Sequence, residues 1–254
     1  MTDYLKSSNI IEEKIYIKDI PAILFRPKGL DKPLKTIIFY HGWTSSKEVQ
    51  RLRGLIYATV GYQVLIPDAI YHGERGAIDY NTADGTYFWK TILNNVDESK
   101  LLVEELLEEY NADSENISVI GHSMGGFTAA GIFTHNPDIK YLVVFNGACA
   151  WQHANEILKS QIGIEITDEL KELENRISEI DPLNNLKLLK DRKILMLHGN
   201  KDGVVPIESQ RYFLRKAKPV YTNQSLVKLI EYHNVNHHIT TGMMEDSISW
   251  LYKE

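Results

Sequence analysis

The sequence of 254 residues has a single cysteine, Cys149, so it cannot form an intrachain disulfide. It also has no apolar run near the roughly 18 residues that a membrane-spanning helix requires. Residues 1–18 mix charged and apolar positions, whereas a secretory signal peptide has an uninterrupted apolar centre. These absences predict a cytoplasmic protein that makes no contact with a membrane.

Positive charge is scarce as well. The chain has 28 Lys and Arg against 34 Asp and Glu, a net charge of −6, and the basic residues are spread thinly. Such a chain offers no concentrated positive face to a nucleic acid. Its His, Asp and Glu residues lack the close spacing of a helical zinc motif, so we expect no metal and no cofactor. The oligomeric state is left open, with a homodimer as one alternative.

Along the rest of the chain, segments with the pattern of strands alternate with segments with the pattern of helices. There are no internal repeats or long linkers, which predicts a single domain over 1–254. Two alternating segments separated by Pro21 predict an antiparallel pair at a sheet edge, and the buried runs after them predict a mostly parallel sheet with helices on both faces. The predicted strands are 13–18, 22–26, 36–40, 62–66, 117–120, 141–145, 193–197 and 226–231. The predicted helices are about 47–60, 95–110, 124–135, 206–217 and 239–252.

One interval does not follow this alternation of strands and helices. Residues 150–190 separate two predicted strands by far more chain than one crossover needs, and they carry two helical patterns, around 153–161 and 167–179. We expect a small helical cap there. Asp181-Pro182 closes it, because a residue before proline is disfavoured in the helical region.

The clearest chemical signal is segment 121–126, which reads Gly-His-Ser-Met-Gly-Gly and lies between the predicted strand 117–120 and helix 124–135. This is the G-x-S-x-G elbow in the strand-turn-helix setting that it requires. The tight turn exposes the Ser123 hydroxyl, and the free N–H groups of the following helix point to where an oxyanion would form. Ser123 is therefore the predicted nucleophile.

A serine hydroxyl needs a base within hydrogen-bond reach and an acid that orients the base. In this class of fold both follow the serine, in the order acid then histidine. Asp202 lies in a turn just after the predicted strand 193–197, and His237 and His238 precede the last helix. We predict Asp202 as the acid and His237 as the base because His237 follows the small polar Asn236; His238 stays an alternative.

Four separate segments share the pattern of a known superfamily. They are residues 41–43 (His-Gly-Trp), 121–126, 198–206 (His-Gly-Asn-Lys-Asp-Gly-Val-Val-Pro) and 236–237 (Asn-His). Together they resemble the α/β-hydrolase superfamily over nearly the whole chain, and within it the small bacterial esterases of the prolyl-oligopeptidase and dienelactone-hydrolase branch. The resemblance implies that the backbone N–H groups of Trp43 and Met124 form the oxyanion hole. Dienelactone hydrolases carry a cysteine where this chain has Ser123, so their substrate is not transferred.

Aromatic residues gather in the predicted loop 77–90 and in the cap. We predict a mostly apolar, partly lidded pocket for short-chain acyl esters, with Tyr71, Trp89 and Trp151 as substrate-binding residues. Arg75, in the segment after strand 62–66, is expected to contact substrate or to pair with Asp68 or Glu74.

The predicted function is therefore a serine carboxylesterase that acts on small-molecule esters. Two alternatives remain. One is a peptidase for short peptides, because prolyl oligopeptidases share the catalytic core. The other is a ligand-binding protein that keeps the fold without the chemistry.

Overall fold

The computed structural model describes residues 6–30, 32–83, 85–162, 168–189 and 191–252. In these residues one eight-stranded sheet runs through the molecule in the order β1-β2-β4-β3-β5-β6-β7-β8. Its strands are β1 (Ile10–Ile17), β2 (Ile20–Pro27), β3 (Leu34–Tyr40), β4 (Gln63–Pro67), β5 (Ala112–His122), β6 (Tyr141–Phe145), β7 (Lys193–Gly199) and β8 (Val227–Tyr232). β1 and β2 pair antiparallel, as do β2 and β4, and every later neighbour pair is parallel.

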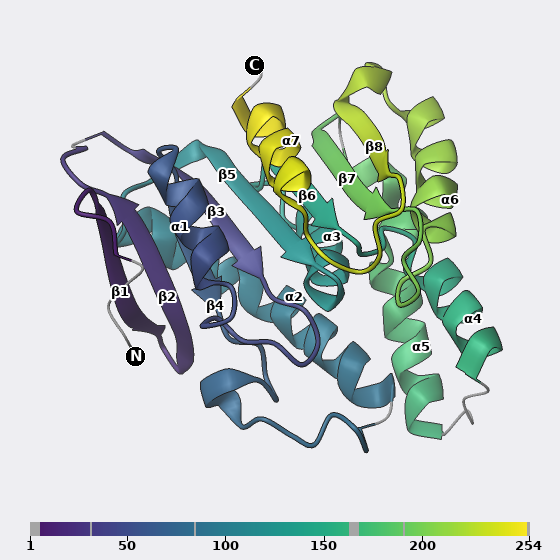
Figure 1. The fold of residues 1–254 in the computed structure, drawn as a ribbon. Helices are drawn as coiled ribbons and strands as arrows, with labels where there is room; N and C mark the ends of the chain where they lie inside the picture. The colour runs from purple at the N-terminus through teal and green to yellow at the C-terminus, as the bar shows by residue number, and fades with distance from the viewer. Residues whose placement is uncertain (1–5, 31, 84, 163–167, 190, 253–254) are drawn as a thin grey trace.

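Helices cover both faces of the sheet (Figure 1). The helices are α1 (Arg51–Thr59), α2 (Gly85–Glu108), α3 (Met124–His135), α4 (Trp151–Ile162), α5 (Asp168–Ile180), α6 (Glu208–Ala217) and α7 (Thr241–Tyr252). Apolar residues of α1 and α7 join one buried cluster with the strands, and those of α2, α3 and α6 join another on the opposite face. The sheet is thus buried on both sides, as its nearly continuous apolar strands require.

The predicted fold class is confirmed: an α/β fold with a mostly parallel sheet and an antiparallel N-terminal edge. One boundary prediction is wrong, because α2 begins at Gly85, ten residues before the predicted start at 95. Residues 85–90 are therefore helical and do not belong to a loop. Buried positions at Thr86, Trp89 and Leu93 continue the helical spacing backwards, but their bulky aromatic neighbours concealed it.

The two helices predicted for the cap are present as α4 and α5, although position 167 lies outside the described residues. Buried Asp181 joins their ends: its carboxylate accepts hydrogen bonds from the backbone N–H groups of Trp151 at 3.1 Å and Gln152 at 2.9 Å, at the start of α4. It also accepts from the N–H of Leu183 at 2.9 Å. One side chain therefore holds the beginning and the end of the α4–α5 pair together.

Candidate active site

The elbow between β5 and α3 places Ser123 in a conformation that few residues adopt. Its φ is 55° and its ψ is −123°. A β-carbon on Gly121 would lie 1.8 Å from the carbonyl oxygen of Gly125, and one on Gly125 would lie 2.1 Å from the carbonyl oxygen of Tyr40. Any larger residue at these two positions would therefore open the turn, and the serine would leave its place at the end of the strand.

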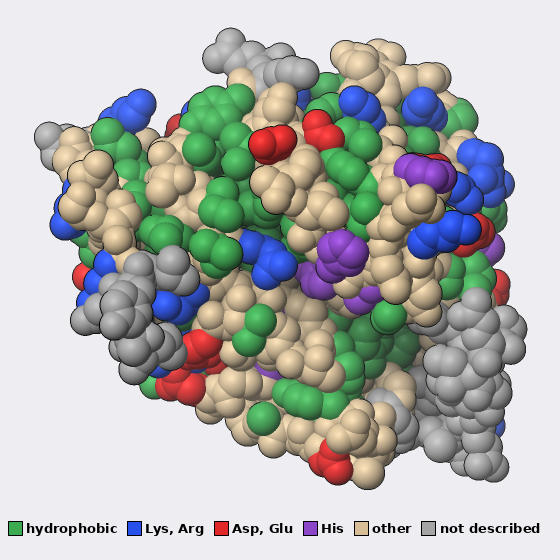
Figure 2. Space-filling view, viewed as in Figure 1, with side chains coloured by type: hydrophobic (Ala, Val, Ile, Leu, Met, Phe, Trp, Pro, Cys, Tyr) green, Lys and Arg blue, Asp and Glu red, His purple; other side chains and the backbone are tan. Residues whose placement is uncertain are grey.

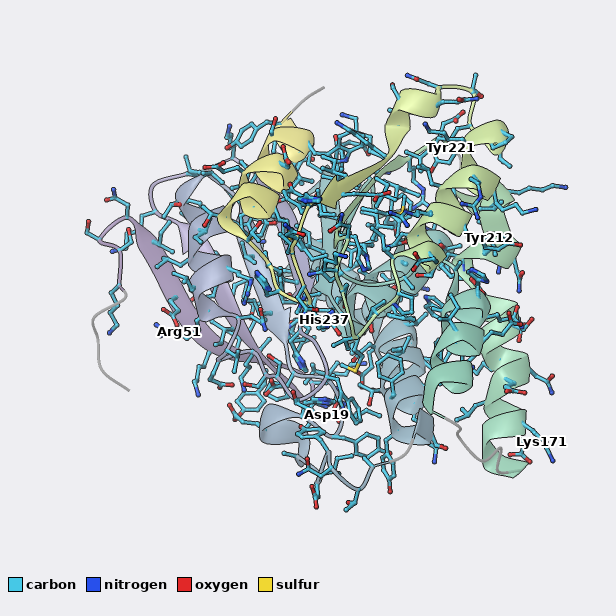
Figure 3. The ribbon with its side chains drawn as sticks, turned by 45° about the vertical axis from the view of Figure 1, so that its right-hand side comes forward. Asp19, Arg51, Lys171, Tyr212, Tyr221 and His237 are labelled. Carbon is cyan, nitrogen blue, oxygen red and sulfur yellow. The ribbon has the colours of Figure 1, made fainter. Side chains whose placement is uncertain are left out.

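Three side chains from distant parts of the chain meet at this turn. The Nε2 of His237 lies 2.8 Å from Oγ of Ser123, and its Nδ1 lies 2.8 Å from Oδ2 of Asp202. Since the carboxylate accepts a hydrogen bond from the N–H at Nδ1, Nε2 carries no proton and is left to accept the serine proton. Figure 3 shows His237 near the centre of the molecule, on the loop that leads into α7.

The carboxylate of Asp202 is fully buried but well satisfied. Its Oδ1 accepts from the N–H groups of Val204 at 2.8 Å and Val205 at 2.9 Å, and Nε2 of His198 lies 3.2 Å from Oδ2. Burial by itself would raise the pKa of Asp202, but the hydrogen bonds from His198 and His237 hold it well below its usual value. Asp202 is thus a carboxylate at any pH near neutrality.

The neighbouring His238 does not share this arrangement. Its side chain is exposed, and only its backbone carbonyl enters the site, where it accepts a hydrogen bond from Nδ2 of Asn146 at 3.0 Å. The Oδ1 of Asn146 accepts from the N–H of Gly199 at 2.9 Å. Asn146 therefore joins the end of β6 to the end of β7 and to the loop that carries His237.

Two backbone segments approach Ser123 from either side. A β-carbon on Gly42 would lie 3.3 Å from Cβ of Ser123, so the loop after β3 touches the serine directly, with Trp43 as its next residue. Met124 is the first residue of α3, and the N–H of a first helical residue has no acceptor one turn back. These are the two positions predicted to supply oxyanion donors.

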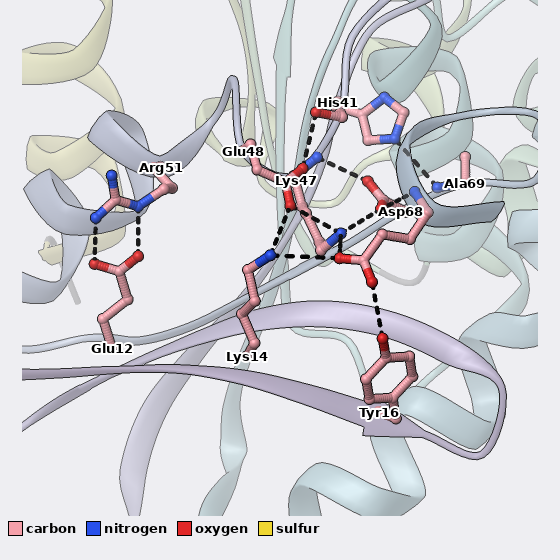
Figure 4. A network of polar contacts seen from close by, with 11 residues as sticks. Glu12, Lys14, Tyr16, His41, Lys47, Glu48, Arg51, Asp68 and Ala69 are labelled. Carbon is pink, nitrogen blue, oxygen red and sulfur yellow. Dashed lines mark hydrogen bonds and ion pairs between the residues drawn. The ribbon is translucent and has the colours of Figure 1, made fainter. Parts of the chain in front are cut away.

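A buried polar network supports the loop after β3 (Figure 4). Nζ of Lys47, whose side chain is 1% exposed, lies 2.5 Å from Oδ2 of Asp68 and 2.6 Å from Oε1 of Glu74. The N–H of Lys47 donates to Oδ1 of Asp68, and the N–H of Ala69 donates to Nε2 of His41. Because each buried charge has an opposite partner, the loop after β3 is tied firmly to the loop after β4.

The predicted ion-pair partners of Arg75, Asp68 and Glu74, are wrong. Both Nη atoms of Arg75 donate to Glu98 on α2, at 2.8 and 2.6 Å. Asp68 and Glu74 are already occupied by Lys47, which is closer and more deeply buried. The sequence could not indicate this, because Glu98 is adjacent only through the packing of α2.

The predicted substrate-binding aromatics lie in different surroundings. Tyr71 is half-buried and makes an edge-on contact with Tyr87, their ring centroids 5.2 Å apart. Trp89 is 3% exposed and Trp151 is 0% exposed, and both pack in an apolar cluster with Met124 beneath the elbow. The two tryptophans therefore offer no surface to a ligand in this structure.

Two residues that support the site, Asn146 and Lys47, escaped the sequence analysis. A signal existed for Asn146, which directly follows a buried parallel strand, where ligand sites of open α/β sheets lie. Lys47 carried no such signal, since a lysine in a loop is normally solvated. Among the residues that the structure describes, no group of three His, Cys, Asp or Glu could hold a metal ion. No helix in the same residues is long and apolar enough to cross a membrane.

The sheet order and the elbow define an α/β-hydrolase. TT1662 of Thermus thermophilus has the same fold, with a TM-score of 0.78 and 18% identity over 96% of this chain and 99% of that one. A model of the prolyl oligopeptidase family matches residues 51–252. The chain belongs to that family.

Relatives within the superfamily have esterase names. The chain is 30% identical over 240 residues to esterase YjfP of Escherichia coli, covering 92% of this chain and 95% of that protein. An esterase of Pyrococcus furiosus superposes with a TM-score of 0.64 and 22% identity, over 95% and 91% of the two chains. A puromycin-hydrolysing peptidase of Mycobacterium tuberculosis, with a TM-score of 0.71 and 17% identity, matches 96% of this chain but only 39% of its own. The predicted resemblance is confirmed.

Proposed function

We propose that this chain is a serine carboxylesterase in which Ser123, His237 and Asp202 form the catalytic triad. The observation that carries the proposal is the continuous hydrogen-bonded series from carboxylate to imidazole to hydroxyl, with both contacts at 2.8 Å. A nucleophile, a base and an orienting acid in this geometry are what acyl transfer requires.

In the first step, Oγ of Ser123 attacks the ester carbonyl carbon while Nε2 of His237 takes the hydroxyl proton. Asp202 stabilises the imidazolium that results, and the N–H groups of Trp43 and Met124 bind the oxyanion. When the tetrahedral intermediate collapses, His237 returns the proton to the departing alcohol and Ser123 keeps the acyl group. His237 then deprotonates a water molecule, which attacks the acyl carbonyl carbon. The bond to Oγ of Ser123 breaks, His237 returns the proton to Oγ, and the acid is released.

The aromatic surroundings of the oxyanion loop favour small, mostly apolar acyl groups. The ring of Trp43 lies edge-on to those of Tyr80 and Phe88, with centroids 5.2 and 6.0 Å away. We therefore propose short-chain acyl esters as substrates, and we expect acetyl and butyryl nitrophenyl esters to be hydrolysed faster than long-chain ones.

Covalent labelling with a fluorophosphonate probe tests the proposal. The wild-type protein is expected to be labelled and to hydrolyse nitrophenyl butyrate, and Ser123→Ala is expected to lose both, since the probe requires an activated serine. Thr128→Ala, also a buried hydroxyl on α3, is the matched control and should still be labelled. A wild-type protein that is folded but neither labelled nor active would favour a ligand-binding role instead.

The family to which the chain belongs gives the second candidate, a peptidase for short peptides. Turnover rates of the ester and the amide of one acyl group distinguish the two candidate functions. We expect turnover of the ester and far less of the amide; the reverse ratio would make the chain a peptidase.

A further inference from the structure

Arg53 lies near the beginning of α1, at the edge of the sheet that carries the candidate site. Because β3 and β4 are parallel, α1 begins at the edge of the sheet where the strands end, and Arg53 lies in its first turn. It shares a helix face with Tyr57, one turn further along, whose hydroxyl lies 2.7 Å from Oγ of Ser247 on α7. Arg53 therefore lies at the same edge of the sheet as Ser123, which follows β5, a strand parallel to β3.

The positive charge of Arg53 also acts on His122, the residue before Ser123. The ring centroids of His122 and His237 are 5.1 Å apart. Burial, together with the positive charges of His237 and Arg53, lowers the pKa of His122 to about 3. Figure 2 shows histidine side chains gathered at the middle of one face of the molecule.

Unlike most arginines nearby, Arg53 has no acidic partner. Its Nη1 donates to Oε1 of Gln50 at 2.7 Å, and no carboxylate of the described residues lies within ion-pair distance. Arg51, two residues earlier, pairs with Glu12. Burial lowers the pKa of Arg53, with Tyr57 as the group that opposes the shift. A half-buried guanidinium that keeps its charge without a counter-ion is costly, unless an anion joins it when the protein works.

We propose that Arg53 binds a carboxylate of the substrate, so that the preferred substrates are esters carrying a negative charge close to the scissile bond. A guanidinium matches a carboxylate in shape and can donate two hydrogen bonds to it. The inference rests on the proposed esterase function, and it adds a charged group to an otherwise apolar pocket.

Two matched pairs of esters test this inference. One pair places the charge on the acyl side, monoethyl glutarate against ethyl pentanoate, and the other on the leaving group, para-acetoxybenzoate against its methyl ester. In at least one pair the wild-type protein is expected to favour the anionic ester in kcat/KM. We expect a preference of about 10- to 100-fold, because hydrogen bonds between charged groups change an affinity by about this factor.

The variants are Arg53→Met and Arg53→Lys, with Arg51→Met as a control that removes the same charge from the same helix. Arg53→Met is expected to lose the preference, Arg53→Lys to keep part of it, and Arg51→Met to keep it fully. The inference fails if the wild-type protein prefers the neutral ester in both pairs, or if the preference survives in Arg53→Met.

The first of these outcomes needs only the wild-type protein, so the test stands even if Arg53→Met does not fold. Glutarate adds an independent readout, because it should inhibit hydrolysis of nitrophenyl butyrate by the wild-type protein competitively. A protein that fluorophosphonate labels and that hydrolyses only the neutral esters would keep the proposed function and refute the role of Arg53. Failure of labelling and of all four esters would instead refute the proposed function.

Discussion

At the scale of the residue, the proposed chemistry depends on which nitrogen of His237 carries a proton. The carboxylate of Asp202 accepts a hydrogen bond from Nδ1 of His237, so Nε2 of His237 faces Ser123 as an acceptor. The same carboxylate is approached by Nε2 of His198, which also lies 3.0 Å from the carbonyl oxygen of Val205. Since both neighbours of that nitrogen are acceptors, His198 donates, and Asp202 is oriented from two sides.

Substitution of the two adjacent histidines separates their roles. We expect His237→Gln to lower kcat by about 10⁴-fold or more, because a triad without its base loses proton transfer. His238→Gln should change kcat by no more than about twofold, since only its backbone carbonyl enters the site. Steady-state rates with nitrophenyl butyrate provide the measurement. Equal losses in the two variants would contradict the assignment of His237 as the base.

At the scale of the element, the site is assembled at the ends of strands, and buried Asn146 joins the ends of β6 and β7 to the loop after β8. It has a φ of 45°, its own N–H donates to the carbonyl of Leu197, and its side chain bonds Gly199 and His238. Gly199 leads into the turn of Asp202. Asn146 therefore holds the turn of Asp202 and the loop of His237 in a fixed relation to each other.

Replacement of Asn146 by alanine should leave a polar N–H and a carbonyl unsatisfied and should let the loop with His237 shift. The expected result is a fall in kcat of up to about 100-fold with little change in KM, because orientation is lost rather than binding. Asn146→Asp keeps the acceptor for the N–H of Gly199, so its kcat should lie between those of the wild-type protein and Asn146→Ala. Asn136→Ala, a buried asparagine at the opposite edge of the sheet, is the control. A rise in KM at constant kcat would show that Asn146 acts on binding instead.

At the scale of the whole molecule, the described core consists of three apolar clusters. Two lie on the faces of the sheet, and the third lies beyond the strand ends, between α2, α3 and the α4–α5 pair. Trp151 fills the third cluster so tightly that a β-carbon on Gly131 would lie 2.6 Å from its ring. The residues beneath the elbow and those at the start of α4 therefore form one packed unit.

Truncation of Trp151 to alanine should therefore act on stability. We expect a loss of about 3–5 kcal/mol, since a large cavity forms under the elbow, and a fall in Tm of about 10 °C for a chain of this size. Thermal unfolding followed by circular dichroism measures both. Tyr87→Ala, which removes an aromatic ring that is 37% exposed, should cost far less. If Trp151→Ala melted like the wild-type protein and only KM rose, Trp151 would be a substrate contact as the sequence suggested.

Much of the molecule follows from local sequence. The period of apolar residues predicts the strands and most helices, and the glycines around Ser123 are required by the turn itself. The order serine, aspartate, histidine named the three residues that the structure brings within hydrogen-bond distance. These features are readable because each depends on neighbours along the chain or on a motif of fixed spacing.

Other features were decided only by the tertiary structure. The start of α2, the partner of Arg75, the burial of Trp89 and the links made by Asn146 all depend on contacts between segments far apart in the chain. The isolation of Arg53 from every described carboxylate is of the same kind. A sequence shows which side chains can carry charge or bury area, whereas the pairing and solvent exposure of each depend on which distant segment packs against it.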